Sequence, residues 1–385
     1  MSQITQPIYL DYNGTTPMDT HVIEAVRPFL ETEFGNPSSS HWYGIIPKKA
    51  VKTARRQVAE LLDCSPGEII FTSGGTESNN HVIMGIAYAF RAKGNHIITS
   101  SIEHPAVLEV CRFLEGFGFK TSYLPVDEQG LVSESDVEKF IRPETVLISI
   151  MHANNEVGTI QPIEKISRIA KEHGIVMHTD AAQSIGKIPT NVSKLGVDLL
   201  SIAGHKVYAP KGIGALYIRQ SITPEKFCHG ADQEMGFRAG TENVFGIVGL
   251  GKACEIAARN LKKSMEHMKM LRDRLHDGLF CELGQIKPNG HPDKRLPNTL
   301  SLSFKGLEAN RILEEIGLKV AASAGAACHS DTVEISHVLQ AMNIPLDWAK
   351  GTLRFSVGRM TTVEQIDKAI RIIVNAVKKL QNSSL

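Results

Sequence analysis

The sequence of 385 residues predicts an α/β fold in which helices cover a largely parallel sheet. Short apolar runs rich in β-branched residues recur through the first two thirds of the chain, and amphipathic stretches of helical period lie between them. Strands that alternate with helices pair in parallel, because each helix returns the chain to the same edge of the sheet. Ligand sites in such sheets gather where the strands end at their carboxyl side.

The expected elements of this large sheet follow one another along the chain. The strands are Glu68–Thr72, His96–Ser100, Val146–His152, Ile175–Asp180, Asp198–Ala203 and Gly214–Arg219. The clearest helical patterns between them are Thr76–Phe90, Ala106–Glu115 and Ile163–His173.

The pattern changes after about Val244. Two long helical segments, residues 244–259 and 261–282, lead into strands near Thr299–Phe304 and Lys319–Ala322, and helices follow at Ile335–Ala341 and Thr362–Gln381. We expect a smaller α+β domain here. The predicted division is a large cofactor-binding domain of residues 15–260 and a small domain of residues 1–14 and 261–385 that carries a cysteine loop.

Composition excludes several classes of protein. Lys and Arg number 42 against 41 Asp and Glu, so nothing indicates a nucleic-acid or membrane surface. The start of the chain lacks the pattern of a signal peptide, and no apolar run approaches the roughly 18 residues that span a bilayer. The six cysteines form no CxxC pair and no metal-like cluster. We therefore expect a cytoplasmic protein without a bound metal ion.

One of these cysteines, Cys328, lies in the segment AASAGAACHS, where its neighbours are small or polar. Structural cysteines are usually buried among apolar side chains, as Cys111 and Cys254 in their helical segments would be. The setting of Cys328 indicates a reactive thiol on a mobile segment.

A turn from strand to helix in FTSGGTES indicates a phosphate site. Gly75 lets the backbone approach an anion, a helix N-terminus offers free N–H groups, and Thr76 adds a hydroxyl. The same pattern is also that of a tight turn with a helix cap. Asp180, at the end of another strand and close to Gln183, can pair with a protonated pyridine nitrogen, which makes such a ring an electron sink.

A lysine that forms a Schiff base is expected at the end of the next strand. Lys206 follows Gly204 and His205 there, a poor setting for a surface lysine. Lys211 is the alternative, disfavoured because it lies past a proline where the chain should turn outward. His104 also follows a strand and can stack on a cofactor ring, although a lone histidine is often structural.

Two further residues can contact a substrate. Asn155, after the strand VLISIMH, can bind a ring oxygen or a substrate carboxylate, or it belongs to a simple turn. Arg354 lies between apolar residues of an expected strand, where an inward-pointing guanidinium needs a partner. That partner is either a bidentate substrate carboxylate or a structural salt bridge.

Together these segments resemble the class V, pyridoxal-phosphate-dependent cysteine desulfurases of the NifS/IscS group and the related selenocysteine lyases. The matching segments include YLDYNGTTP, FGNPSS, IIFTSGGTESNN, SSIEHPAV, MHANNEVGTIQP, HTDAAQSIGK, GHKVYAPKGIGALYIR, RAGTEN, PNTLSLSF, GAACHS and LRFSVGR, in order over nearly the whole chain. The resemblance implies a fold type I transferase with a seven-stranded sheet, a homodimer, and pyridoxal 5′-phosphate as cofactor.

The resemblance also implies roles for individual residues. Cofactor contacts would come from Lys206 (the aldehyde), Asp180 (the pyridine nitrogen), Gln183 and Asn155 (the ring oxygen), His104 (the ring face), and Gly75, Thr76, His205 and the partner subunit's Thr241 (the phosphate). Arg354 would bind the substrate carboxylate, and the catalytic residues would be Lys206, His104 and Cys328.

The implied reaction starts when the amino group of L-cysteine displaces Lys206 from the cofactor. Lys206 then takes the Cα proton, and the thiolate of Cys328 attacks the substrate sulfur. The products are L-alanine and a persulfide, whose sulfur passes to an acceptor protein in iron–sulfur cluster biogenesis, in tRNA or DNA thiolation, or in a selenium pathway.

Some features of the chain depart from the common desulfurase pattern. Ala203 stands where many desulfurases have a serine that contacts the phosphate, so one hydrogen bond is expected to be missing. The segments FRAGTEN and GAACHSD are closer to the selenocysteine lyase branch, which leaves selenocysteine lyase as the alternative activity. A non-catalytic scaffold for sulfur-acceptor proteins is a third possibility, disfavoured because Lys206 and Cys328 are both retained.

Overall fold

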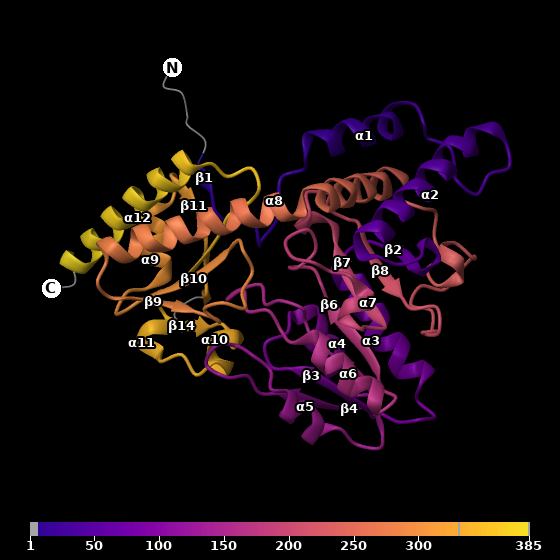
Figure 1. Ribbon diagram of the computed structural model, residues 1–385, viewed down its shortest axis with the longest axis horizontal. Coiled ribbons are helices and arrows are strands. Elements are labelled where there is room, and N and C mark those ends of the chain that lie inside the picture. Colours follow the sequence, from indigo (N-terminus) through magenta and orange to yellow (C-terminus); the bar gives the residue numbers. More distant parts are fainter. Residues whose placement is uncertain (1–6, 330–331, 384–385) are drawn as a thin grey trace.

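The computed structural model describes residues 7–329 and 332–383, with the side chains of residues 326–329, 332–334 and 383 outside the description. It confirms the α/β fold, with a large seven-stranded sheet in the order β2-β8-β7-β6-β5-β3-β4 (Figure 1). All neighbouring strands are parallel except β8, which is antiparallel to both β2 and β7. The strands are β2 (Ile69–Thr72), β3 (His96–Ser100), β4 (Lys120–Leu124), β5 (Thr145–Ser149), β6 (Val176–Asp180), β7 (Leu199–Ala203) and β8 (Gly214–Ile218).

Six of the seven strands are buried along their whole length, which explains why they read as continuous apolar runs in the sequence. The seventh, β4, is at the edge of the sheet and is partly exposed. The strand β4 was not predicted from the sequence, because its polar residues Lys120, Thr121 and Ser122 form no apolar run.

Helices cover both faces of the large sheet. Successive strand residues alternate between two cores: Leu199 packs in the cluster that contains α3 and α4, and Leu200 in the cluster that contains α2, α6 and part of α8. The helices before α8 are α1 (Thr20–Glu31), α2 (Trp42–Leu62), α3 (Gly75–Ala89), α4 (Pro105–Glu115), α5 (Glu134–Phe140), α6 (Ile163–Glu172) and α7 (Val192–Leu195), with short 3-10 helices η1 (Pro66–Glu68), η2 (Gly204–Lys206) and η3 (Glu234–Gly236).

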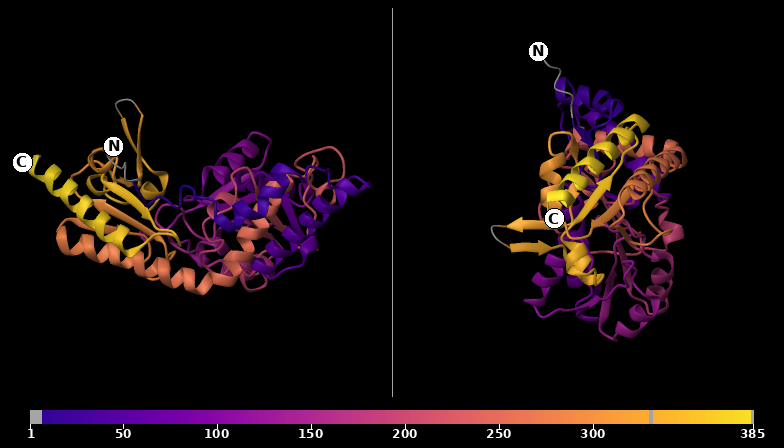
Figure 2. Two further views of the ribbon diagram at one scale, coloured as in Figure 1. Left: turned by 90° about the horizontal axis from the view of Figure 1, so that it is seen from above. Right: turned by 90° about the vertical axis from the view of Figure 1, so that its left-hand side faces the viewer.

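A second, four-stranded antiparallel sheet in the order β12-β15-β10-β9 forms the centre of the C-terminal part. The N-terminal strand β1 pairs in parallel with β11 beside it. Strands β13 and β14 form a hairpin that projects from this part of the molecule (Figure 2). The elements are β1 (Ile8–Tyr9), β9 (Ile286–Asn289), β10 (Thr299–Phe304), α9 (Ala309–Ile316), β11 (Val320–Ala321), β12 (Ser323–Ala324), β13 (Ala326–His329), β14 (Thr332–Ile335), α10 (His337–Ala341), α11 (Leu346–Ala349), β15 (Thr352–Ser356) and α12 (Val363–Ser383).

A single 39-residue helix, α8 (Val244–Glu282), replaces the two expected helical segments and runs through both parts of the molecule (Figure 1). Asn260, where a break was expected, lies within the continuous helix, and its side-chain amide donates to the carbonyl of Ile256. The first half of α8 contributes Leu250 to the core beneath the large sheet, and the second half contributes Leu275 to the core of the small sheet.

Within residues 7–329 and 332–383, no helix combines the length and the apolar character needed to cross a membrane.

Candidate active site

A cavity of about 310 Å³ opens at the carboxyl ends of β6 and β7. It brings together nine of the candidate cofactor- and substrate-binding residues, which come from segments far apart in the chain. They are Gly75, Thr76, His104, Asn155, Asp180, Gln183, His205, Lys206 and Arg354. The remaining lining residues are Asn13, Gly14, Asn79, Ala106, Met151, Ala153, Ala182 and Ala203.

The carboxylate of Asp180 ends β6 and is held at both oxygens. Its Oδ1 accepts from the backbone N–H of Ala182 at 2.8 Å, and its Oδ2 accepts from the side-chain amide of Asn79 at 2.7 Å. The Oδ1 of Asn79 is buried without a hydrogen-bond partner in the described part of the chain. Asn79 therefore positions Asp180, a role that was not predicted, although the segment TESNN that contains it is part of the family resemblance.

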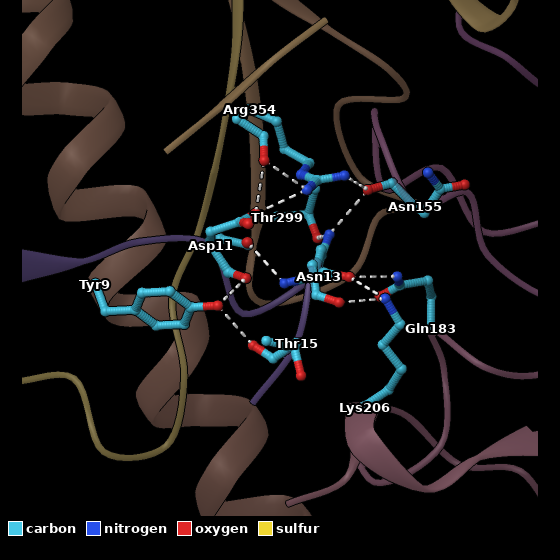
Figure 3. Close-up of polar contacts among 12 residues, drawn as sticks. Tyr9, Asp11, Asn13, Thr15, Asn155, Gln183, Lys206, Thr299 and Arg354 are labelled. Atoms are coloured by element: carbon cyan, nitrogen blue, oxygen red, sulfur yellow. Dashed lines mark hydrogen bonds and ion pairs between the residues drawn. The ribbon is translucent and has the colours of Figure 1, made fainter. Parts of the chain in front are cut away.

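The amino group of Lys206 projects from η2 toward the N-terminal segment, where it donates to the carbonyls of Asn13 at 2.5 Å and Gly14 at 2.7 Å (Figure 3). Burial, followed by the positive charge of Arg354, lowers the pKa of Lys206 to about 8. A lysine with such a pKa is partly neutral near physiological pH, so it can act as a nucleophile or as a base.

Asn13 connects the two sides of the cavity and was missed in the sequence. Its side-chain amide donates to Thr299 at 2.8 Å and to the carbonyl of Asn155 at 3.1 Å, and its carbonyl accepts from the amide of Gln183 at 3.0 Å (Figure 3). Asn13 therefore ties β10 of the small sheet to the ends of β5 and β6.

Both histidines of the cavity are held as neutral rings. His104 caps α4, with its Nδ1 accepting from the N–H of Ala106 at 3.1 Å, and burial lowers its pKa. His205 lies 3.1 Å from the hydroxyl of Thr15, and burial together with the charge of Lys206 lowers its pKa to about 4. Neutral imidazoles can stack on a ring or share hydrogen bonds without adding charge.

The N-terminus of α3 faces the cavity through Gly75 and Thr76. The residue that precedes the helix is Gly74, which provides no side-chain cap for the first N–H groups. A Cβ on Gly75 would lie 3.2 Å from the Cβ of Ala203, so small residues are needed on both sides of this contact. The uncapped helix start and the small residues make room for an anion such as a phosphate.

Arg354 of β15 forms the opposite wall of the cavity. Its guanidinium forms an ion pair with Asp11 and donates to Ser323 at 3.0 Å and to the carbonyl of Asn155 at 3.1 Å. Its Nε is buried and has no partner among the residues that the structure describes. Asp11 is thus the partner that Arg354 would have if its role were a structural salt bridge, but the Nε–H of Arg354 is still free, among the described residues, to donate a hydrogen bond.

Glu103, the residue before His104, carries a buried carboxyl group. Glu103 is fully buried and accepts from Ser100 at 2.5 Å and from the N–H of Met151 at 2.9 Å. Burial raises the pKa of Glu103 to about 8. Glu103 was not predicted as a site residue, because a glutamate next to a loop is normally exposed.

Three residues that were considered for the cofactor and catalytic site lie outside this cavity. Thr241 lines a separate cavity of about 200 Å³ together with Phe71 and Arg238. Lys211 is exposed beyond Pro210. The backbone of Cys328 pairs with Val333 in the β13–β14 hairpin, and its side chain lies outside the described residues.

No group of three His, Cys, Asp or Glu side chains in the described ranges could hold a metal ion.

Comparison with known proteins points to one family. The family model for class-V aminotransferases matches residues 8–369. The chain is 49% identical to a cysteine desulfurase IscS of Dictyoglomus turgidum over 98% of this chain and 96% of the relative. It is 48% identical to a cysteine desulfurase IscS of Methanosarcina thermophila over 100% of this chain and 95% of the relative.

Solved structures give the same result. A NifS-like protein superposes with a TM-score of 0.91 at 39% identity, covering 97% of this chain and 100% of its own. A structure described as SspA in complex with cysteine superposes with a TM-score of 0.81 at 38% identity, covering 93% of this chain and 100% of its own.

Proposed function

Because this chain belongs to the class-V aminotransferase family and is a cysteine desulfurase of the NifS/IscS group, we propose that its cavity binds pyridoxal 5′-phosphate and L-cysteine. The observation that carries the proposal is that Lys206, whose pKa is lowered to about 8, and the carboxylate of Asp180 line the same cavity. Members of this family depend on pyridoxal phosphate, which supplies an electron sink for a negative charge at the substrate Cα.

The donor set fits this cofactor. Lys206 would bond to its aldehyde, Asp180 would face its ring nitrogen, and Gln183 and Asn155 its ring oxygen. His104 would lie against the ring face, and the N-terminus of α3, with Gly75, Thr76 and His205, would hold the phosphate. Support comes from the uncapped start of α3 and from the two hydrogen bonds that aim the Asp180 carboxylate.

The substrate carboxylate is assigned to Arg354 and Asn155. Arg354 has a buried Nε without a partner in the described residues, and its other nitrogens can turn from Asp11 and Ser323 toward an incoming carboxylate. A bidentate contact of this kind fixes the orientation of an amino acid as well as its affinity.

Three groups of the chain would carry out the chemistry. Neutral Lys206 would take the Cα proton and return it to the product, and His104 would assist proton transfer near the ring. The thiolate of Cys328 attacks the substrate sulfur, the carbon–sulfur bond breaks, and its electron pair ends as a C–H bond of L-alanine. The transferred sulfur remains on Cys328 as a persulfide until an acceptor protein takes it.

A homodimer is part of this proposal. The segment from α1 to α2 exposes large apolar side chains, among them Phe34 at 77% and Trp42 at 67% exposure, which a second copy of the chain would cover. In that dimer the partner subunit's Thr241 would contact the phosphate. Two further expectations also stay proposals. One is the division into a domain of residues 15–260 and a domain of residues 1–14 with 261–385, which two separate cores support. The other is a cytoplasmic location.

The test is turnover by the purified protein loaded with pyridoxal phosphate. With a thiol reductant such as dithiothreitol present to reduce the persulfide, we expect L-alanine and sulfide from L-cysteine, and no turnover by Lys206→Ala, with Lys211→Ala as the matched control. Parallel assays with L-selenocysteine address the alternative activity. Absence of a visible cofactor band, or full activity of Lys206→Ala, would contradict the proposal.

A further inference from the structure

Lys187 is a buried lysine that the proposed reaction does not use. It follows β6 in a tight turn, where Gly186 adopts φ +67 and a Cβ on that glycine would approach Val207 to 2.8 Å. The turn sends the lysine side chain inward, and only 5% of Lys187 is exposed. A methionine would fill the same space without the cost of burying an amino group, so packing alone does not explain a lysine here.

The hydrogen bonds of Lys187 lead directly to the cavity. Its Nζ donates to Oε1 of Gln183 at 2.8 Å and to Oδ1 of Asn13 at 3.3 Å, and both acceptors are neutral amide oxygens. A lysine amino group donates these bonds whether it is charged or neutral. Burial, followed by the charges of Lys206 and Arg354, lowers the pKa of Lys187 well below its usual range.

This arrangement determines which way the amide of Gln183 faces. Because Nζ donates to Oε1, the oxygen of Gln183 must point toward Lys187, and its NH₂ group must point the other way. In the structure that NH₂ group donates to the carbonyl of Asn13 at 3.0 Å, the same oxygen that accepts from Lys206. The donor end of Gln183 is therefore held on the Lys206 side of the cavity.

We propose that Lys187 is a positioning residue, which makes Gln183 a hydrogen-bond donor toward the ring oxygen of the cofactor. The inference rests on the proposed function, in which pyridoxal phosphate binds with its ring oxygen at Gln183. Without Lys187 the amide can rotate by half a turn and present its oxygen, which would repel an anionic ring oxygen. A donor at this place stabilises the ring oxygen as an anion and lowers the pH at which the linkage between Lys206 and the cofactor loses its proton.

The test measures that pH from the visible absorption of the reconstituted protein. Wild type, Lys187→Met, Gln183→Ala and the double variant are titrated, and Lys194→Met on the exposed surface of α7 serves as the control for the same chemical change. Apart from Lys187 itself, these substitutions leave the charged and titratable groups around the cavity in place, namely Asp11, Glu103, His104, Asp180, His205, Lys206 and Arg354.

We expect Lys187→Met to raise the midpoint by roughly one pH unit, the equivalent of one ordinary hydrogen bond. The double variant should then have the midpoint of Gln183→Ala, because one residue acts through the other. Additive shifts would mean that Lys187 acts by its charge alone, and an unchanged midpoint in Lys187→Met would mean that it is only structural. Either result overturns the inference.

A second substitution covers the case in which Lys187→Met does not fold. Lys187→Gln keeps an NH₂ donor on a side chain one atom shorter, and its midpoint should stay near that of wild type. A shift as large as that of Gln183→Ala would overturn the inference. Failure of the proposed function itself is recognised separately, because the wild-type protein would then show no visible cofactor band.

Discussion

The carboxylate of Asp11 and the guanidinium of Arg354 form an ion pair of 2.7 Å, both side chains being largely shielded from water. A substrate carboxylate that binds Arg354 must therefore compete with a carboxylate of the protein itself. The affinity for an amino acid reflects the difference between these two partners and not the full strength of an arginine–carboxylate bond.

Replacement of Arg354 by Gln should weaken the binding of L-cysteine by roughly 10- to 100-fold, the range for a lost hydrogen bond to a charged group. Cysteamine, which lacks the carboxylate, should bind equally well to both proteins. Spectral titration with the two compounds gives the comparison, and Arg274→Gln, in an exposed ion pair on α8, is the control. Equal losses for both compounds would show that Arg354 has only a structural role.

The apo-protein should react with free pyridoxal phosphate at a rate that depends on the protonation of Lys206. Only the neutral amine attacks an aldehyde, and the pKa of Lys206 is lowered to about 8 by burial. The second-order rate constant should rise with pH and level off above about pH 8. A rate that continues to rise beyond pH 10 would indicate an ordinary, exposed lysine.

Asp180→Asn should keep the cofactor but slow proton exchange at the substrate Cα by at least about 100-fold, since a neutral amide does not hold the proton on the ring nitrogen. Deuterium incorporation into L-cysteine or L-alanine measures this step alone. Asn79→Ala frees one oxygen of Asp180 and should give a smaller defect of the same kind. Exchange at the wild-type rate in Asp180→Asn would exclude this role of the carboxylate.

Cys328→Ser should still bind L-cysteine, seen as a spectral change, but should form no persulfide and release L-alanine at least about 100-fold more slowly. Proton removal at Cα needs Lys206, whereas removal of sulfur needs a thiolate at the substrate. Cys281→Ser is the control, since Cys281 is an exposed free cysteine on α8. A persulfide found on another cysteine of the serine variant would refute the role of Cys328.

Glu103 should make the stability of the protein depend on pH. Its folded pKa of about 8 exceeds the ordinary value of 4.5, so the folded state binds more protons than the unfolded state between these values. The stabilisation from Glu103 is complete below pH 4.5 and is lost as pH rises through 8. The free energy of unfolding of Glu103→Gln, taken relative to that of wild type, should therefore rise by on the order of 1 to 3 kcal/mol between pH 5 and pH 8. Unfolding by urea at both pH values measures this, and a constant difference would contradict it.

The buried strands of the large sheet could be predicted because a strand that is buried on both faces appears in the sequence as a continuous apolar run. The expected strand His96–Ser100 has the same bounds as β3, whereas the edge strand β4 has no such run. The break expected at Asn260 was wrong, because the two halves of α8 pack into two separate cores that support one continuous helix.

The candidate site was predictable where a residue stands at the end of a strand, as Asp180 does. The network around Asn13 was not, because its partner Lys187 is 174 residues away and neither residue belongs to a periodic pattern. Contacts of this kind depend on how the N-terminal segment lies across the ends of the strands, which no local pattern records. The roles of Cys328 and Thr241 stay predictions.

The continuity of α8 has a consequence for the choice of substrate. A helix of 39 residues, roughly 58 Å long, bends only gently unless a proline or an inserted group interrupts it. Arg354 belongs to the small sheet and Asp180 to the large sheet. The two sheets are therefore connected by one stiff helix. We expect this fixed distance between the two charges to exclude amino acids with a longer backbone, such as β-amino acids.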